Sequence, residues 1–259
     1  MARFYFDDSK HPRYGFSLGV FVLSDDDPTN SVHDAIAAVG LVPKVDEYKS
    51  SAIKKDSPEL KELRLLLLNI IFESCRLGVL IVNNDLELGR EALHLLSKMA
   101  QHPDVLGQDH SVYLDQGLFK SAKHGQTAAD NLNLKRHFTF HFEQNSVAVA
   151  GIQLADLAAH HCSTILAEAL GYVTKKVPAG ESSGYDPEMN MEIGFELWAD
   201  SRYRFLFSPL DLPRDWDGNQ DDLVADMKKY ALHVAPSVDD NLRKVALHTF
   251  GSTYLGCIH

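Results

Sequence analysis

Cysteine is scarce in this sequence. The 259 residues include only Cys75, Cys162 and Cys257. An odd number of cysteines at such wide spacing provides neither a disulfide framework nor a paired-cysteine metal knuckle, and it is typical of a reducing compartment. We therefore expect free, buried thiols in a cytoplasmic protein.

Long uninterrupted hydrophobic runs are also missing. The most apolar window runs from Leu63 to Val82, and it contains the charged residues Arg64, Glu73 and Arg76. Three charges within such a window argue against a membrane span. The first residues contain no apolar core of signal-peptide length either. We expect no membrane partner.

The sequence has no excess of positive charge. It contains 25 Lys and Arg against 36 Asp and Glu, a formal net charge of −11. The acidic excess is concentrated in residues 181–226, which hold twelve acids and three arginines. With no global basic field, any nucleic acid must be bound locally. The acidic segment is either a solvated surface, a repulsive border that confines nucleic acid to one groove, or a docking region for a basic protein.

Motifs of several common enzyme classes do not occur. There is no GxxxxGK[ST] and no GxGxxG, which argues against a P-loop NTPase or a dinucleotide enzyme. The thirteen histidines form no HExxH or spaced Cys/His set of the kind that binds zinc. No convincing Ser-His-Asp or Cys-His arrangement is present.

The hydrophobic patterns predict an α/β protein. We expect strands at 3–7, 14–23, 78–82, 111–114 and 136–142, and helices at 31–39, 57–76, 87–99 and 149–170. A hairpin followed by strands that alternate with helices indicates a mixed sheet with helices packed on it. Residues 116–135 are polar and have no clear pattern. Beyond Gly171 we expect helices at about 188–205, 219–232 and 238–248. The chain thus divides into a core of residues 1–170 and a mainly helical C-terminal extension of residues 171–259.

One acid stands out because it lies within an otherwise apolar helix. Asp156 follows Gln153 and Leu154-Ala155, and His160 comes one turn later. A carboxylate held against a sheet must be ion-paired or bound to a metal, because burying it alone costs several kcal/mol. An ordinary structural ion pair is the competing interpretation.

Three further acids occur at informative points. Asp7 and Asp115 each follow a predicted strand, and Glu47 lies after the hairpin region. Taken singly, Asp7 suits a turn and Glu47 a solvated pair with Lys49. Asp85, which follows the strand at 78–82, is a rival to Asp115 as the third strand-end acid.

Together these acids fit a metal-dependent hydrolase. Carboxylates that converge from separate elements can hold two Mg²⁺ or Mn²⁺ ions, which prefer oxygen ligands. Two such ions activate a water and stabilise the leaving oxygen of a phosphodiester. This chemistry needs no serine or cysteine nucleophile.

The sequence resembles a known family at four places. Tyr5-Phe6-Asp7-Asp8-Ser9, Glu47-Tyr48-Lys49, Val112-Tyr113-Leu114-Asp115 and Ile152-Gln153-Leu154-Ala155-Asp156 are similar to motifs of the domain of unknown function 3800 family (DUF3800). Two positions depart from the family pattern, with Asp8 in place of Glu and Lys10 in place of Gly. The resemblance covers roughly residues 2–170.

The resemblance implies an RNase H-like nuclease of prokaryotes and their mobile elements. It implies that Asp7, Glu47, Asp115 and Asp156 are both the metal ligands and the catalytic residues. Lys120 and Lys123 are candidates for binding nucleic acid, because residues 116–137 carry a net charge of +3. Lys49 is a third candidate, which could neutralise charge on the phosphate or only pair with Glu47. The alternatives are a catalytically inactive adaptor that binds a protein through its acidic C-terminal region, and a metal hydrolase of small phosphate esters. A homo-oligomer is compatible with each.

Overall fold

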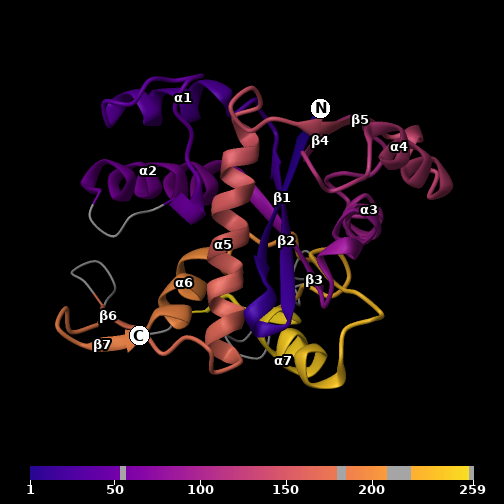
Figure 1. The fold of residues 1–259 in the computed structure, drawn as a ribbon. Coiled ribbons are helices and arrows are strands. Elements are labelled where there is room, and N and C mark those ends of the chain that lie inside the picture. The colour runs from indigo at the N-terminus through magenta and orange to yellow at the C-terminus, as the bar shows by residue number, and fades with distance from the viewer. Residues whose placement is uncertain (53–56, 180–184, 209–222, 257–259) are drawn as a thin grey trace, which may run out of the picture.

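The computed structural model describes residues 1–52, 57–179, 185–208 and 223–256. Its centre is a six-stranded mixed sheet with the strand order β5-β4-β1-β2-β3-β9. These strands are β1 (Arg3–His11), β2 (Phe16–Ser24), β3 (Cys75–Val82), β4 (His110–Asp115), β5 (Phe138–Gln144) and β9 (Leu232–Val234). Helices pack around the sheet (Figure 1). The predicted α/β fold with a mixed central sheet is therefore confirmed.

The first two strands form a longer hairpin than the sequence predicts. β1 pairs with β2 in antiparallel fashion from Arg3↔Ser24 to His11↔Phe16. The turn lies at Pro12–Tyr14 and closes on Gly15, whose φ of 74° suits glycine. The first strand therefore continues past residue 7, where the sequence pattern predicts its end. Asp7 lies inside β1, opposite Val20.

The later strands run parallel to β1. β4 pairs with β1 from Arg3↔Ser111 to Phe6↔Leu114, and β5 pairs with β4. The parallel pairing with β4 ends at Phe6, one residue before Asp7. Asp7 and Asp115 therefore follow the last residues of the β1–β4 pairing, although Asp7 still pairs with Val20 of β2 and Asp115 with Gln144 of β5.

Two helices cover opposite faces of the sheet. α5 (Gly151–Ala169) lies along β1, and a Cβ atom on Gly151 would lie 2.5 Å from the ring of Tyr5. α3 (Leu88–Met99) packs on the other face, where a Cβ atom on Gly78 would lie 2.6 Å from the sulfur of Met99. Small residues at these contacts let the helices approach the sheet closely. Because successive strand residues point to opposite faces, Tyr5 and Asp7 share the face that α5 covers.

The remaining helices of the N-terminal part agree with the sequence patterns. α1 (Thr29–Ala38) and α2 (Pro58–Ser74) match the predicted helices. The Ser57 hydroxyl accepts a hydrogen bond from the backbone N–H of Leu60, as expected for an N-cap before a first-turn proline. α4 (Ala122–Asn131) lies in the segment where the sequence gave no clear pattern.

The C-terminal part contains short strands as well as helices. α6 (Ile193–Ser201) and α7 (Asp240–Phe250) occupy parts of two predicted helices. The small strands are β6 (Lys176–Pro178), β7 (Asn190–Glu192), β8 (Val224–Asp226) and β10 (Ser252–Tyr254). The helix expected at 219–232 is wrong, because residues 224–226 form β8 and Leu232 begins β9. Its first residues, up to 222, lie outside the described ranges.

The C-terminal part also completes the central sheet. β9 pairs with β3 in parallel from Val79↔Leu232 to Ile81↔Val234. Closer to the start of β3, the N–H of Leu77 donates to the carbonyl of Arg204 at 2.7 Å, and Leu206 donates to the carbonyl of Leu77 at 2.9 Å. The outer edge of β3 is therefore covered by two segments that follow it distantly in the sequence.

Two sequence-based expectations concern the surroundings of the protein. In the ranges that the structure describes, no helix combines the length and the apolar character needed to cross a bilayer. Cys75 and Cys162 are free and buried, as expected. Cys257 lies outside the described residues.

Candidate functional site

Asp7 is a carboxylate in an unfavourable place. It is only 7% exposed, and its Oδ1 accepts a hydrogen bond from the backbone N–H of Asp8 at 2.7 Å. Burial raises the pKa of Asp7 to about 8, and the charges of Asp115 and Asp156 add to this effect. Asp7 therefore lies near both of these acids, and no lysine, arginine or histidine of the described ranges forms an ion pair with it.

Asp115 is the acid that β4 brings to Asp7. It is the last residue of β4, as predicted, and it is partly buried. Burial raises its pKa, the backbone N–H of Gln116 and the charge of Lys49 oppose the rise, and Asp156 and Glu47 add to it. Its Oδ1 is buried and has no hydrogen-bond partner among the described residues. An orphaned carboxylate oxygen of this kind is an available ligand position.

Asp85, the rival to Asp115, lies elsewhere at this edge of the sheet. It begins a short 3₁₀ turn after β3, and its charge raises the pKa of Asp8, after the larger effect of burial. Asp8 points to the sheet face opposite Asp7. The geometry therefore favours Asp115 as the companion of Asp7.

Asp156 lies on α5, as predicted, and is 8% exposed. Its Oδ2 accepts from the backbone N–H of Ser50 at 2.8 Å, and its Oδ1 accepts from the Ser50 hydroxyl at 2.5 Å. Burial raises its pKa, while these two hydrogen bonds oppose the rise. Instead of a lysine or arginine in direct contact, Asp156 has a serine, which the sequence did not reveal.

Glu47 and Lys49 approach the cluster from the loop before Ser50. The Lys49 ammonium lies 3.7 Å from Glu47 Oε2 and donates to the Ser146 hydroxyl at 3.0 Å. The Ser146 hydroxyl in turn donates to Glu47 Oε2. The charge of Lys49 opposes the rise in the pKa of Asp115 and Asp156. Lys49 is thus a cation that partly balances the acids.

Gln153 explains why this loop meets α5. Its Oε1 accepts from the backbone N–H of Tyr48 at 2.8 Å, and its Nε2 donates to the carbonyl of Ser146 at 3.0 Å. Gln153 and Asp156 lie three residues apart, on one face of the helix. Together they hold residues 48–50 and 146 in place, and Tyr48 is fully buried beside them.

Replacing Gln153 with Ala tests this positioning role. The change leaves two buried backbone groups without partners, so we expect the free energy of unfolding to fall by about 2–4 kcal/mol. Urea denaturation measures the loss. Gln126→Ala is the matched control, because Gln126 is an exposed helical glutamine, and we expect a change within about 0.5 kcal/mol there. Equal effects of the two changes would contradict the positioning role.

The four predicted acids converge from three elements and a loop. Three of them have pKa values raised by burial and by their neighbours' charges. Within the described ranges, however, no three carboxylate, imidazole or thiol side chains are gathered closely enough to hold one metal ion as they stand. Asp156 and Glu47 direct oxygens at serine hydroxyls instead.

The donor set nevertheless suits a hard divalent cation. It offers only oxygen ligands from mutually repelling carboxylates, together with the orphaned Oδ1 of Asp115. Asp156 and Glu47 each keep lone pairs for a cation beside their serine hydrogen bonds. Within the described ranges, neither Asp7 nor Asp115 accepts a hydrogen bond from a side chain.

The basic residues named from the sequence do not all reach the cluster. Lys49 does, as described above. Lys120 lines a separate groove beside α3 and α4, and Lys123 lines a smaller concavity near it. Neither Lys120 nor Lys123 shows a contact with the four acids.

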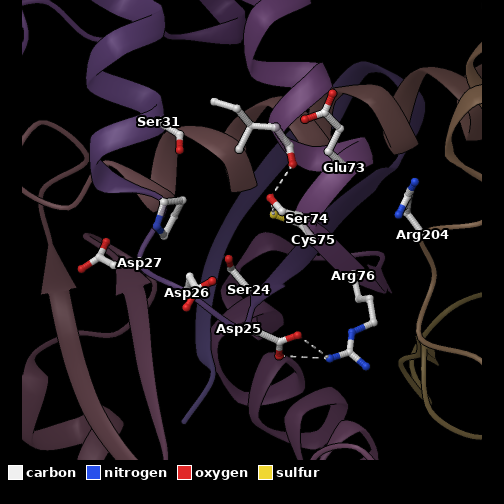
Figure 2. A pocket seen from close by; sticks show the side chains of 12 residues that line it. Ser24, Asp25, Asp26, Asp27, Ser31, Glu73, Ser74, Cys75, Arg76 and Arg204 are labelled. Carbon is white, nitrogen blue, oxygen red and sulfur yellow. Dashed lines mark hydrogen bonds and ion pairs between the residues drawn. The ribbon is translucent and has the colours of Figure 1, made fainter.

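Another pocket lies at the other end of the central strands, where β1 begins and β2 ends. Its volume is about 460 Å³, and its wall includes Asp25, Asp26, Asp27 and Glu73. Figure 2 shows Arg76 reaching Asp25, which it contacts at 3.2 Å. None of the four predicted acids lines this pocket, so it is separate from the carboxylate cluster.

Comparison with known proteins adds no assignment. No family model matches the chain, and no curated protein is significantly similar to it. The chemistry of the site therefore has to be inferred from its own residues.

Proposed function

We propose that this protein is a metal-dependent phosphodiesterase that hydrolyses nucleic acid, built on an RNase H-like core. The observation that carries the proposal is the convergence of Asp7, Asp115 and Asp156, with Glu47 beside them. Burial and neighbouring charges raise the pKa of each of the three aspartates. Buried carboxylates that repel one another destabilise the folded protein unless a bound cation neutralises them. Clusters of this kind are therefore typical of functional sites.

The fold and the motif resemblance support the same proposal. An antiparallel hairpin continued by parallel strands is the mixed sheet expected of the core that the DUF3800 resemblance implies. The Glu-x-Lys and Gln-Leu-Ala-Asp motifs that carry the resemblance meet through Gln153 and Asp156. Two motifs that lie about 100 residues apart in the sequence thus meet at one site.

Each residue of the cluster has a role in this proposal. Asp7 and Asp156 are the primary ligands, and Glu47 and Asp115 complete the set. One or two Mg²⁺ or Mn²⁺ ions, when bound, supply an activated water and stabilise the leaving oxygen. Lys49, which pairs with Glu47, would neutralise charge on the phosphate.

Two measurements on the wild-type protein test the proposal. Isothermal titration calorimetry with Mn²⁺ should detect binding to the folded protein. Labelled DNA, RNA and hybrid substrates should be cleaved with Mg²⁺ or Mn²⁺ and remain intact in EDTA. Lack of cleavage of every substrate in the presence of bound metal would contradict the nuclease assignment. If the protein binds metal and cleaves no nucleic acid but hydrolyses a small phosphate ester, the result would favour the alternative of a metal hydrolase of small phosphate esters.

Failure of the calorimetric experiment would favour the adaptor alternative. The serine and lysine contacts of Asp156 and Glu47 would then be the permanent state of the cluster. Much of the acidic segment 181–226, through which the adaptor would bind a protein, lies outside the described residues.

A further inference from the structure

A groove opens on the face of the sheet that α3 covers, opposite the face that carries Asp7. Its volume is about 660 Å³, and it lies between the loop after β3, the start of α3, the loop after β4, and α4. Its wall combines cationic and apolar side chains. The most informative of them are Lys10, Arg90, Lys120, Leu86, Phe119 and His124.

The groove is connected to the carboxylate cluster through two strands. Gly117, two residues after Asp115, forms part of its wall. Lys10 also lines it, and its ammonium lies 3.7 Å from Asp8, the residue next to Asp7. A chain molecule that lies across this edge of the sheet can therefore reach both the acids and the groove.

The groove wall is positively charged in a protein of net charge −11. Its three lysine and arginine side chains face a single acid, Asp85. Two of these cations form ion pairs with acids outside the groove lining. Lys10 pairs with Asp8, and Arg90 pairs with Glu87 and with the buried Glu91. Lys120 is exposed and has no ion-pair partner within the described part of the chain. Lys120 is thus the cation most available to a phosphate.

The apolar part of the wall is partly open to solvent. Leu86 is 87% exposed, and Phe119 is half-buried. Phe119 is held edge-on against Phe142, with ring centroids 5.4 Å apart. Gly89 lets the loop come close, because a Cβ atom there would lie 2.4 Å from the carbonyl oxygen of Leu118. The loop that carries Phe119 and Lys120 is therefore fixed against α3.

We propose that this groove binds an unpaired segment of the nucleic-acid strand next to the bond that is cleaved; this inference rests on the proposed nuclease function. Phosphates contact Lys120, Arg90 and Lys10, and bases lie against Phe119 and Leu86. Sites for single strands combine cations that follow the backbone with apolar faces on which bases stack. A duplex keeps its base faces covered and would leave Leu86 and Phe119 unused. The proposal therefore commits to single-stranded substrate at this position.

Binding measurements without metal test this groove. Fluorescence anisotropy of a labelled single-stranded oligonucleotide in EDTA compares wild type with Lys120→Glu and Leu86→Ala. We expect Lys120→Glu to weaken binding roughly tenfold and to reduce its salt dependence. We expect Leu86→Ala to weaken binding roughly threefold or more, and wild type to bind a duplex of the same sequence more weakly.

Two variants on α2 serve as matched controls. Lys61→Glu reverses the charge of another exposed lysine, and Leu65→Ala truncates a leucine that is 62% exposed. Both should bind the oligonucleotide as wild type does. Equal weakening by the controls, or unchanged binding by Lys120→Glu and Leu86→Ala, would overturn the groove assignment. Duplex binding as tight as single-strand binding would overturn it as well.

Cleavage assays on the same variants separate this inference from the proposed function. If Lys120→Glu and Leu86→Ala bind and cleave as wild type does, while Asp156→Asn cannot cleave, the nuclease proposal stands and the groove proposal fails. If wild type binds the oligonucleotide through Lys120 and Leu86 and cleaves nothing, the groove proposal stands and the nuclease proposal fails.

Discussion

Replacing Asp156 or Asp7 with Asn should lower metal-dependent cleavage of nucleic acid at least a hundredfold. An amide removes the negative charge that a divalent cation requires and offers only one weakly basic oxygen. A metal ion contributes several kcal/mol of transition-state stabilisation, and each 1.36 kcal/mol corresponds to a tenfold change in rate. The quantity to measure is kcat/KM at fixed Mg²⁺ on the best substrate.

Asp34→Asn is the control for this experiment. Asp34 is an exposed aspartate on α1, away from the cluster, and its replacement should leave the rate unchanged. Circular dichroism should show that all three variants fold. If both Asp7→Asn and Asp156→Asn retain full cleavage, these two residues are not the ligands.

Asp7→Asn should also make the metal-free protein more stable at pH 8. Burial and the charges of Asp115 and Asp156 raise the pKa of Asp7 to about 8, from an ordinary value of 3.8. The folded state therefore holds this proton more tightly than the unfolded state. The resulting stabilisation is complete below about pH 4 and is lost as the pH rises to about 8. Asn removes this loss because it is neutral at every pH.

We expect the gain at pH 8 to be about 2–4 kcal/mol, smaller than the full linkage value because the cluster relaxes. The raised pKa values of Asp8, Asp115 and Asp156 act in the same direction. The buried His160 and His161, whose pKa burial lowers to about 4, act in the opposite direction, so the effect of Asp7 is the difference between the two proteins at each pH. Urea denaturation of both proteins at pH 5 and pH 8 measures these differences. An Asp7→Asn protein whose stability relative to wild type is the same at pH 5 and pH 8 in EDTA would contradict the interpretation of the cluster.

The sequence alone predicts the long periodic elements well. The Ser57 cap and the following proline place the start of α2, and the Ala-rich stripe places α5 with Asp156 inside it. Asp115 also lies at the end of its strand as expected. These features depend on local patterns, which a single sequence contains.

The misplaced elements depend on contacts between distant residues. β1 continues through Asp7 and Asp8 because β2 pairs with it as far as Phe16, which overrides the turn tendency of the two aspartates. Residues 224–226 form β8 because Ser252–Tyr254 pair with them. Neither partner can be identified from the local pattern.

The hydrogen bonds of the site were equally hidden. Gln153 was recognisable as sharing a helix face with Asp156, but no pattern indicated that Ser50 and Ser146 would contact Asp156 and Glu47. Serine in an irregular loop carries almost no signal of its own. The groove could not be predicted from the sequence either, because its cations Lys10, Arg90 and Lys120 come from three separate segments of the chain.

The covering of β3 by residues 204–206 and β9 affects how this chain can be made. While the ribosome is still synthesising the last third of the protein, β3 has its hairpin-side neighbour but an open row of amides and carbonyls on the other side. Such a row is a template for pairing with other nascent chains. The C-terminal third removes this template as soon as residues 204–206 and β9 pair with β3.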